Sequence, residues 1–323
     1  MATPYSRMFL NLVPWYSILI VTGAALAIWL AVREEKRSGL PKDTVIDFSL
    51  LALPCGILGA RIYFVLFSWS RFRSDFLSVF RIWEGGIAIY GAVIGGLLAA
   101  VFFSRRRRIS VLTLCDLIAP GLILAQAIGR WGNYFNQEAY GLQVTSPSLC
   151  FFPFAVLIES GSDSGWHMAT FFYESCWNFL VFFFLLRARR KWFRYPGDVF
   201  FFYAYLYACG RLIIEDFRMD SLYAASDLRI SQLLSLLICS ALLIRYLFLF
   251  RLSHVSGFPR FFVFLSFLLN IAFVPFMTGI FSWPQQPLRF FLLLLCSMMN
   301  LFALMSLYRC ASEGDILYAD VRK

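Results

Sequence analysis

Long apolar stretches alternate with short polar ones along most of the chain. About nine stretches are long enough to cross a bilayer as a helix, which takes roughly 20 residues. They lie near residues 14–32, 44–67, 86–104, 111–130, 169–187, 197–214, 231–251, 260–281 and 288–308. This pattern predicts an all-α polytopic membrane protein.

The overall composition supports the same fold class. The 323 residues are 60% hydrophobic and only 15% charged, whereas a soluble domain usually carries about 25% charged residues. The eight cysteines are scattered and the two histidines lie far apart, so neither set has the spacing of a metal site. We therefore expect no metal and no other cofactor.

The charge of +10 could indicate nucleic acid as a partner, but its distribution argues for membrane lipid instead. Basic residues follow the odd-numbered spans, and residues 131–168 contain no Lys or Arg. This alternation is the positive-inside pattern, and it predicts an outer N-terminus. Arg71, Arg73 and Arg81 in the second loop are exceptions. We expect residues 131–168 to form a small outer cap between spans four and five.

Ionisable residues inside spans are functional candidates, because an arginine at a helix centre costs roughly 2.5–3.5 kcal/mol on insertion scales. They are Arg61, Asp116, Arg130, Arg211, Glu215 and Arg245. The predicted topology brings several polar groups to the outer leaflet. These groups stand at the start of span one, the start of span three, the end of span four and the end of span six.

The spacing of Arg211, Glu215 and Arg218 predicts one helix face with alternating charges. Such a row can join helices through ion pairs, or it can bind an anion. Counting these arginines and Arg130 against Glu138 and Glu215 leaves one excess positive charge, which favours an anion such as lipid phosphate.

Two groups of glycines stand at the outer entry to the third span and within it. Gly91 and Gly95 have the spacing of close helix packing. Gly85 and Gly86 allow two interpretations: they can pack closely, or they can break the helix and expose backbone N–H groups to an anion.

The stretch "GRWGNYFNQEAYG" at residues 129–141 resembles the signature of the bacterial prolipoprotein diacylglyceryl transferases. Supporting matches follow in the same order: "PWYSILIVTG" (14–23), "GARIYFVLF" (59–67), "WEGGIAIYGAVIGG" (83–96), "DLIAPGLILAQAIGR" (116–130), "TFFYES" (170–175) and "GRLIIEDFRMD" (210–220). The resemblance covers about residues 12–250. Since the family has seven spans, it implies a transferase core at 1–252 and an extension at 253–323 with two transmembrane helices.

The resemblance implies transfer of the diacylglyceryl group of phosphatidylglycerol to the lipobox cysteine of a prolipoprotein signal peptide, with release of glycerol phosphate. The reaction would take place at the outer leaflet of the bacterial cytoplasmic (inner) membrane. It also implies the site: Arg130 and Arg211 on the phosphate, with Tyr90 and Glu138 as further catalytic residues. The implied substrate-binding residues are Tyr16, Arg61, Gly85, Gly86, Asn133, Asn136, Gly141, Glu215 and Arg218.

Two positions depart from the family pattern. Tyr90 stands where some members have a histidine, the proposed general base, and a tyrosine with a pKa near 10 is a poor base. Tyr90 would then have a positional role, or nearby arginines would favour the substrate thiolate. His167 is one residue further from "YES" than the family histidine and has no proline after it. The resemblance allows a functional role, but we expect an exposed loop histidine. Residues 253–323 carry almost no intramembrane charge, so we expect the chemistry in residues 1–230.

Two other classes of function remain open on the sequence. A transporter also uses broken helices and intramembrane charges, but its site usually lies near the midplane between repeated halves. Another enzyme that uses phosphatidylglycerol, such as a headgroup transferase, would share the arginines without needing a peptide groove.

Overall fold

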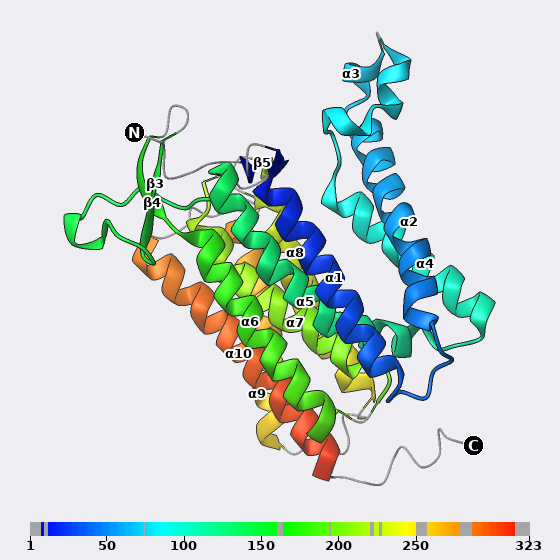
Figure 1. Cartoon of the computed structure of the whole chain (residues 1–323). Helices are drawn as coiled ribbons and strands as arrows, with labels where there is room; N and C mark the ends of the chain where they lie inside the picture. The colour runs from blue at the N-terminus through cyan, green and yellow to red at the C-terminus, as the bar shows by residue number, and fades with distance from the viewer. Residues whose placement is uncertain are drawn as a thin grey trace. The chain divides into compact units, whose positions relative to one another are not determined.

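The structure is a computed structural model that describes residues 8–9, 12–73, 75–159, 164–193, 195–219, 223–225, 228–249, 257–277 and 286–313. Helices dominate the described residues (Figure 1). Their bounds are α1 Trp15–Glu35, α2 Thr44–Phe67, α3 Trp69–Phe72, α4 Ile89–Arg107, α5 Val111–Asn136, α6 Thr170–Lys191, α7 Asp198–Ile214, α8 Ile230–Leu249, α9 Gly257–Met277 and α10 Gln286–Glu313.

Short elements connect the helices. Three antiparallel hairpins pair β1 Met8–Phe9 with β2 Val13–Pro14, β3 Ala155–Ile158 with β4 Gly165–Met168, and β5 Tyr223–Ala225 with β6 Leu228–Arg229. The 3-10 turns are η1 Phe76–Phe80, η2 Ile82–Glu84, η3 Pro147–Leu149 and η4 Glu215–Phe217. The hairpin β3–β4 belongs to the polar segment between α5 and α6, where the sequence predicts a cap.

Each predicted span coincides with a helix to within a few residues. In the described part of the chain, six helices are long and apolar enough to cross a membrane: Trp15–Glu35, Thr44–Phe67, Ile89–Arg107, Val111–Asn136, Thr170–Lys191 and Leu288–Ser306. Two shorter apolar helical stretches lie at Ile230–Tyr246 and Phe261–Phe273, and α7 has 17 residues. The protein is therefore a multi-pass membrane protein.

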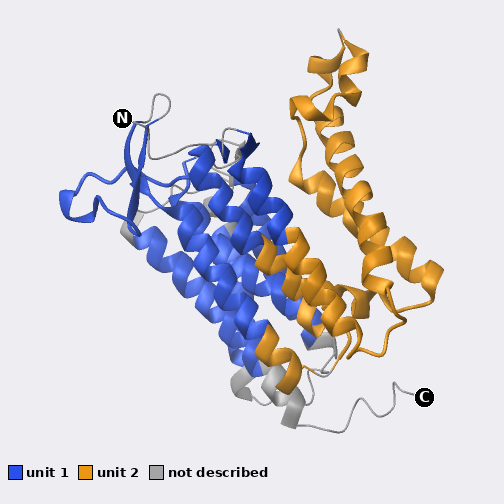
Figure 2. Ribbon diagram, viewed as in Figure 1, with its two compact units in different colours: residues 1–23, 126–185, 201–323 blue, residues 24–125, 186–200 orange. Residues whose placement is uncertain are grey.

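The chain divides into two compact units (Figure 2). Unit 2 contains Ala24–Ala125 and Leu186–Phe200. Its helices α2 and α4 pack against each other through glycines: a Cβ at Gly59 would collide with the Gly91 carbonyl, and one at Gly95 with the Cys55 carbonyl. This close approach confirms the packing interpretation of Gly91 and Gly95.

Asp116, an intramembrane candidate from the sequence, has a structural role in unit 2. Its carboxylate accepts hydrogen bonds from the backbone N–H groups of Gly197, at 2.5 Å, and Phe200, at 2.9 Å. These donors surround the first turn of α7, where N–H groups have no partner within the helix. Asp116 therefore caps α7 from α5.

Unit 1 contains Met1–Gly23, Gln126–Leu185 and Phe201–Lys323. It holds the C-terminal part of α5, most of α6 and α7, and helices α8, α9 and α10, of which the last three pack together. An apolar core joins Leu212, Leu236, Phe273, Leu293 and Cys296.

Candidate active site

A buried carboxylate joins two arginines from different helices in unit 1. Oε1 of Glu174 on α6 lies 2.6 Å from Nη2 of Arg130 on α5. Oε2 of the same carboxylate lies 2.9 Å from Nη1 of Arg211 on α7. The Glu174 side chain is 3% exposed, and the Arg130 and Arg211 side chains are 22% and 11% exposed. One carboxylate therefore sets the position of both guanidinium groups.

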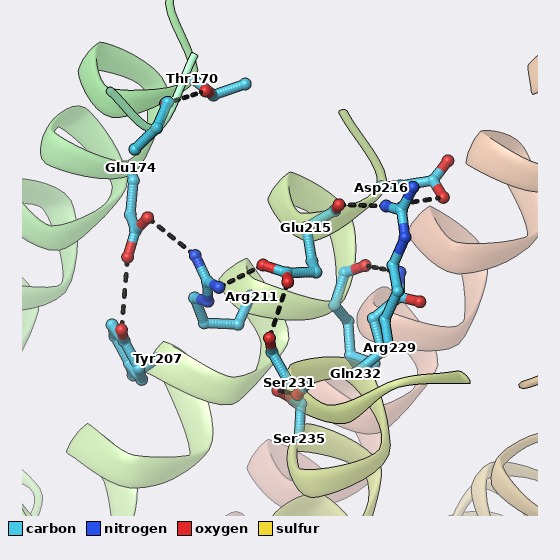
Figure 3. Close-up of polar contacts among 12 residues, drawn as sticks. Thr170, Glu174, Tyr207, Arg211, Glu215, Asp216, Arg229, Ser231, Gln232 and Ser235 are labelled. Atoms are coloured by element: carbon cyan, nitrogen blue, oxygen red, sulfur yellow. Dashed lines mark hydrogen bonds and ion pairs between the residues drawn. The ribbon is translucent and has the colours of Figure 1, made fainter. Parts of the chain in front are cut away.

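The network continues from Arg211 to a second buried carboxylate. Arg211 donates to Glu215, four residues later, and the Ser231 hydroxyl donates to Glu215 Oε1 at 2.7 Å. The Tyr207 hydroxyl donates to Glu174 Oε1 at 3.3 Å. Figure 3 shows Arg211 between the two glutamates. We call Arg130, Glu174, Tyr207, Arg211 and Glu215 the arginine–glutamate network.

Contacts between the helices position this network. Trp131 donates to the Ser175 hydroxyl at 3.1 Å, and Ser175 donates to the Ala127 carbonyl at 2.8 Å, which fixes α5 against α6. The Trp177 indole donates to the Leu206 carbonyl at 2.9 Å, which fixes α6 against α7. Each of these contacts includes a residue within one turn of Arg130 or of Glu174. The apolar sequence thus forms the helices, and a few polar side chains set their register.

Sequence reasoning missed Glu174. It stands within the stretch "TFFYES" and inside predicted span five, but it is not among the intramembrane candidates chosen from the sequence. Including Glu174 removes the expected excess of positive charge, since three arginines then stand against three carboxylates. The charge balance predicted from sequence was wrong, because the acidic partner of Arg130 and Arg211 lies on a third helix.

Arg218 differs from the expectation of one continuous helix face. α7 ends at Ile214, and η4 then turns the chain so that Arg218 has an extended backbone with ψ of 138°. Arg211 and Glu215 do pair as predicted, but Arg218 no longer continues their row. It still has a favourable electrostatic interaction with Glu174.

The end of α5 forms a turn that carries the predicted residues Asn133, Asn136 and Glu138. The backbone N–H of Glu138 donates to the Asn133 carbonyl at 3.0 Å, and the Asn136 amide donates to Glu138 Oε1 at 3.1 Å. Gln137 and Ala139 have positive φ, which reverses the chain here. Asn133 and Glu138 help to line a small pocket together with Tyr140 and residues of β3.

Gly141 and His167 hold the hairpin to the turn. A Cβ on Gly141 would lie 2.7 Å from the Thr170 side chain and 2.9 Å from the Phe217 carbonyl, so only glycine fits there. His167 is 2% exposed, and its Nδ1 lies 2.9 Å from the Gly141 carbonyl. The expectation of an exposed loop histidine was wrong, because His167 lies on β4 and packs on Tyr140.

Tyr16 lies at the start of α1, beside the helix that carries Arg130. A Cβ on Gly132 would lie 2.5 Å from Tyr16 Cδ2, so this glycine makes room for the ring. The side chain of Tyr16 is partly exposed. The structure thus brings Tyr16 next to α5, two residues beyond Arg130.

Arg61, Gly85, Gly86 and Tyr90 lie in unit 2. Arg61 is 6% exposed and donates through Nε, Nη1 and Nη2 to backbone carbonyls, among them those of Gly85 at 2.6 Å and Gly86 at 2.8 Å. Both glycines have positive φ, and α4 begins only at Ile89. Gly85 and Gly86 therefore precede α4, and their backbone carbonyls accept hydrogen bonds from Arg61. Tyr90 packs against Tyr63, with ring centroids 6.2 Å apart.

Among the described residues, no group of three or more His, Cys, Asp and Glu side chains is arranged to hold a metal ion. The chemical resources of the candidate site are therefore its guanidinium groups, its carboxylates and its hydroxyls. Such a set can bind and stabilise a phosphate.

Comparison with known proteins identifies relatives for most of the chain. Residues 8–250 match the family model described as prolipoprotein diacylglyceryl transferase. A phosphatidylglycerol–prolipoprotein diacylglyceryl transferase of Enterococcus faecalis is 47% identical over 241 residues, or 74% of this chain and 87% of the relative. The enzymes of the same name from Streptococcus agalactiae and Halalkalibacterium halodurans are 43% and 42% identical over 75% and 76% of this chain, and the matches cover 93% and 86% of those relatives.

Proposed function

The chain belongs to the prolipoprotein diacylglyceryl transferase family, and we propose that its arginine–glutamate network performs the phosphate chemistry of this reaction. The activity is that of a phosphatidylglycerol–prolipoprotein diacylglyceryl transferase. Its acceptor is the lipobox cysteine thiol in a prolipoprotein signal peptide, and glycerol phosphate is the second product.

The reaction moves charge onto a phosphate oxygen. The substrate thiolate attacks the glyceryl carbon that carries the phosphodiester, so a carbon–sulfur bond forms while the bond between that carbon and the phosphate oxygen breaks. The bonding electrons leave with glycerol phosphate, and the thiol proton goes to solvent or a base. A cation beside the phosphate stabilises the developing charge, and this kind of stabilisation is often the largest single contribution to catalysis.

The observation that carries the proposal is the shared carboxylate. Glu174 holds the guanidinium groups of Arg130 and Arg211 on its two carboxylate oxygens. Both groups are therefore already ordered before the lipid binds. Arg130 is the more exposed of the two and contacts Glu174 through Nη2. We infer that Arg130 is the direct phosphate ligand. Arg211, which bridges both glutamates, adds charge and keeps the network in register.

The surrounding residues complete the proposed site. Tyr16 beside α5 would contact the headgroup, and Asn133, Asn136 and Glu138 at the pocket would hydrogen-bond the substrates. Glu215 orients Arg211, and Arg218 adds positive charge near Glu174.

The proposed location is the outer leaflet of the bacterial cytoplasmic membrane, with the N-terminus outside. We expect single cysteines placed at residues 142–149 to react with an impermeant thiol reagent in intact cells. Cysteines at 105–108 should react only after the membrane is permeabilised, because the basic last turn of α4 should face the cytoplasm. The opposite labelling would reverse the topology and refute the outer-leaflet site.

Tyr90 is the test of the missing general base. We expect Tyr90→Phe to retain most activity, since the Tyr90 ring packs on Tyr63 and an unperturbed phenol is a poor base at neutral pH. The rate of transfer to a lipobox peptide would be measured against that of Tyr63→Phe, the matched change in the contacting ring. A collapse in the Tyr90 variant alone would assign its hydroxyl a direct part in the reaction.

The function itself is tested with the purified full-length chain, phosphatidylglycerol labelled separately in its diacylglyceryl and headgroup parts, and a lipobox peptide. Diacylglyceryl label on the peptide cysteine, with headgroup label released as glycerol phosphate, supports the proposal. Headgroup label on another acceptor would indicate a headgroup transferase. Movement of unchanged lipid across vesicles, without any transfer, would indicate a transporter.

A further inference from the structure

The helix α10 lies beyond residues 8–250, yet it contacts the segment that carries Glu215. Nε of Arg289, near the start of α10, lies 2.5 Å from Oδ1 of Asp216 in η4. The next residue along α10, Phe290, packs on Phe217 with ring centroids 5.1 Å apart. Arg289 is thus one of the few charged residues of the extension, and it lies against η4.

Asp216 is held from two sides. Its side chain is 4% exposed, and Nη1 of Arg229 lies 3.6 Å from the same oxygen that Arg289 contacts. Arg229 also donates to the backbone carbonyl of Glu215 (Figure 3). Burial raises the pKa of the Asp216 carboxyl, while Arg289 and Arg229 oppose that rise. A buried carboxylate needs such partners, because burial without them disfavours its charged form.

The turn η4 has three residues, and each faces a different partner. Glu215 binds Arg211, Asp216 binds Arg289, and Phe217 packs on α10. Consecutive residues of one tight turn cannot move independently, because their backbone is shared. The ion pair of Asp216 with Arg289 of α10 therefore also sets the position of Glu215 in the arginine–glutamate network.

α10 is itself fixed to the rest of unit 1. The Ser297 hydroxyl donates to the Cys209 carbonyl of α7 at 3.3 Å. The side-chain amides of Asn270 on α9 and Asn300 on α10 exchange hydrogen bonds at 3.1 and 2.9 Å. These hydrogen bonds fix α10 next to η4. Its contact with the turn then combines the packing of Phe290 with the directed ion pair of Arg289.

We propose that α10 is a positioning element for diacylglyceryl transfer, in which Arg289 fixes η4 so that Glu215 holds Arg211 toward the substrate phosphate. This inference rests on the proposed role of Arg211. Buried ion pairs often give little net stability compared with apolar packing, and in some proteins they are retained because they specify geometry. Arg289 acts through Asp216 and Glu215 and is not expected to contact the substrate.

The test replaces Arg289 with methionine, which keeps an extended apolar side chain and removes the charge. We expect kcat per folded molecule to fall by at least about tenfold, because a small misplacement of a catalytic group can cost up to about 100-fold. KM for phosphatidylglycerol should change less than kcat. Arg289→Lys should recover most of the activity, since it restores a cation near Asp216.

Two further variants separate positioning from stability. Glu34→Gln removes the charge that pairs with Arg189 in unit 2, which contains neither η4 nor α10, so it should lower thermal stability and leave kcat of the folded protein unchanged. In a Glu215→Gln background, Arg289→Met should cost little more, because the residues act through one path. The inference would be overturned if folded Arg289→Met had the kcat of the wild type. It would also be overturned if the loss of kcat in the double variant equalled the product of the two single-variant losses. Full activity of Arg211→Ala would instead overturn the proposed site.

Discussion

Arg130→Ala and Arg211→Ala are each expected to lower diacylglyceryl transfer by about 10²–10³-fold, the usual cost of losing one group that stabilises transition-state charge. Both arginines are held on Glu174, so each change removes a charge whose position was set in advance. The loss should be mainly in kcat for Arg211. For Arg130, the more exposed group, KM for phosphatidylglycerol should rise as well. The rates are measured with labelled donor and a lipobox peptide.

Lysine substitutions separate charge from geometry. Arg211 binds Glu174 through Nη1 and Glu215 through Nη2, and a single ammonium group cannot reproduce that planar bridge. Arg211→Lys should therefore remain poorly active. Arg130→Lys keeps one contact with Glu174 but loses the fork for a phosphate, so it too should rescue weakly.

The matched control for these variants is Arg189→Ala. Arg189 is also 11% exposed and pairs with Glu34 at 2.6 Å, but it lies in unit 2. This variant loses an ion pair of similar burial without touching the arginine–glutamate network, so its activity per folded molecule should stay near that of the wild type. Near-normal transfer by both Arg130→Ala and Arg211→Ala would leave the network with only a role in joining helices.

The helices could be predicted from the sequence because their signal is local. An apolar stretch of about 20 residues has one stable form in lipid, since a helix satisfies its own backbone hydrogen bonds. Predicted span two, at 44–67, coincides with α2 at both ends. Predicted span six also ends at 214, as α7 does, but the single helix face expected for Arg211, Glu215 and Arg218 was wrong, because the chain turns into η4 at Glu215. Arg229 and Arg289, which contact η4, are distant in sequence.

The site could be predicted only in part, for a related reason. Arg130, Arg211 and Glu215 stand out as costly charges within apolar stretches, and the structure does join them. The shared partner Glu174 lies on another helix, and single-helix spacing cannot reveal a contact across helices. Arg61 shows the same limit: its charge stands out in the sequence, but the sequence does not reveal that its three guanidinium nitrogens donate to backbone carbonyls 17 to 24 residues away.

Glu174→Gln is the second change with a large expected effect. Glutamine has nearly the shape of glutamate, but it presents an NH2 group to one of the two arginines and removes the negative charge between them. Arg130 and Arg211 would then repel each other without a carboxylate between them. Arg130, which has no second glutamate partner among the described residues as Arg211 has in Glu215, should leave its position. Transition-state stabilisation would suffer most, so we expect kcat to fall by at least about tenfold, given the sensitivity of catalysis to misplaced groups.

The kinetic pattern of this variant distinguishes a catalytic network from helix-joining ion pairs. Removing Glu174's charge makes the site more positive, so phosphatidylglycerol should still bind, and KM should not rise while kcat falls. Glu34→Gln is the control, because Glu34 pairs with Arg189 in unit 2 and does not belong to the network. If Glu174 only joined helices, its variant would resemble this control: less folded protein, lower thermal stability, and unchanged kcat and KM for the molecules that fold. That outcome would show that the ordering of Arg130 and Arg211 by Glu174 is not needed for transfer.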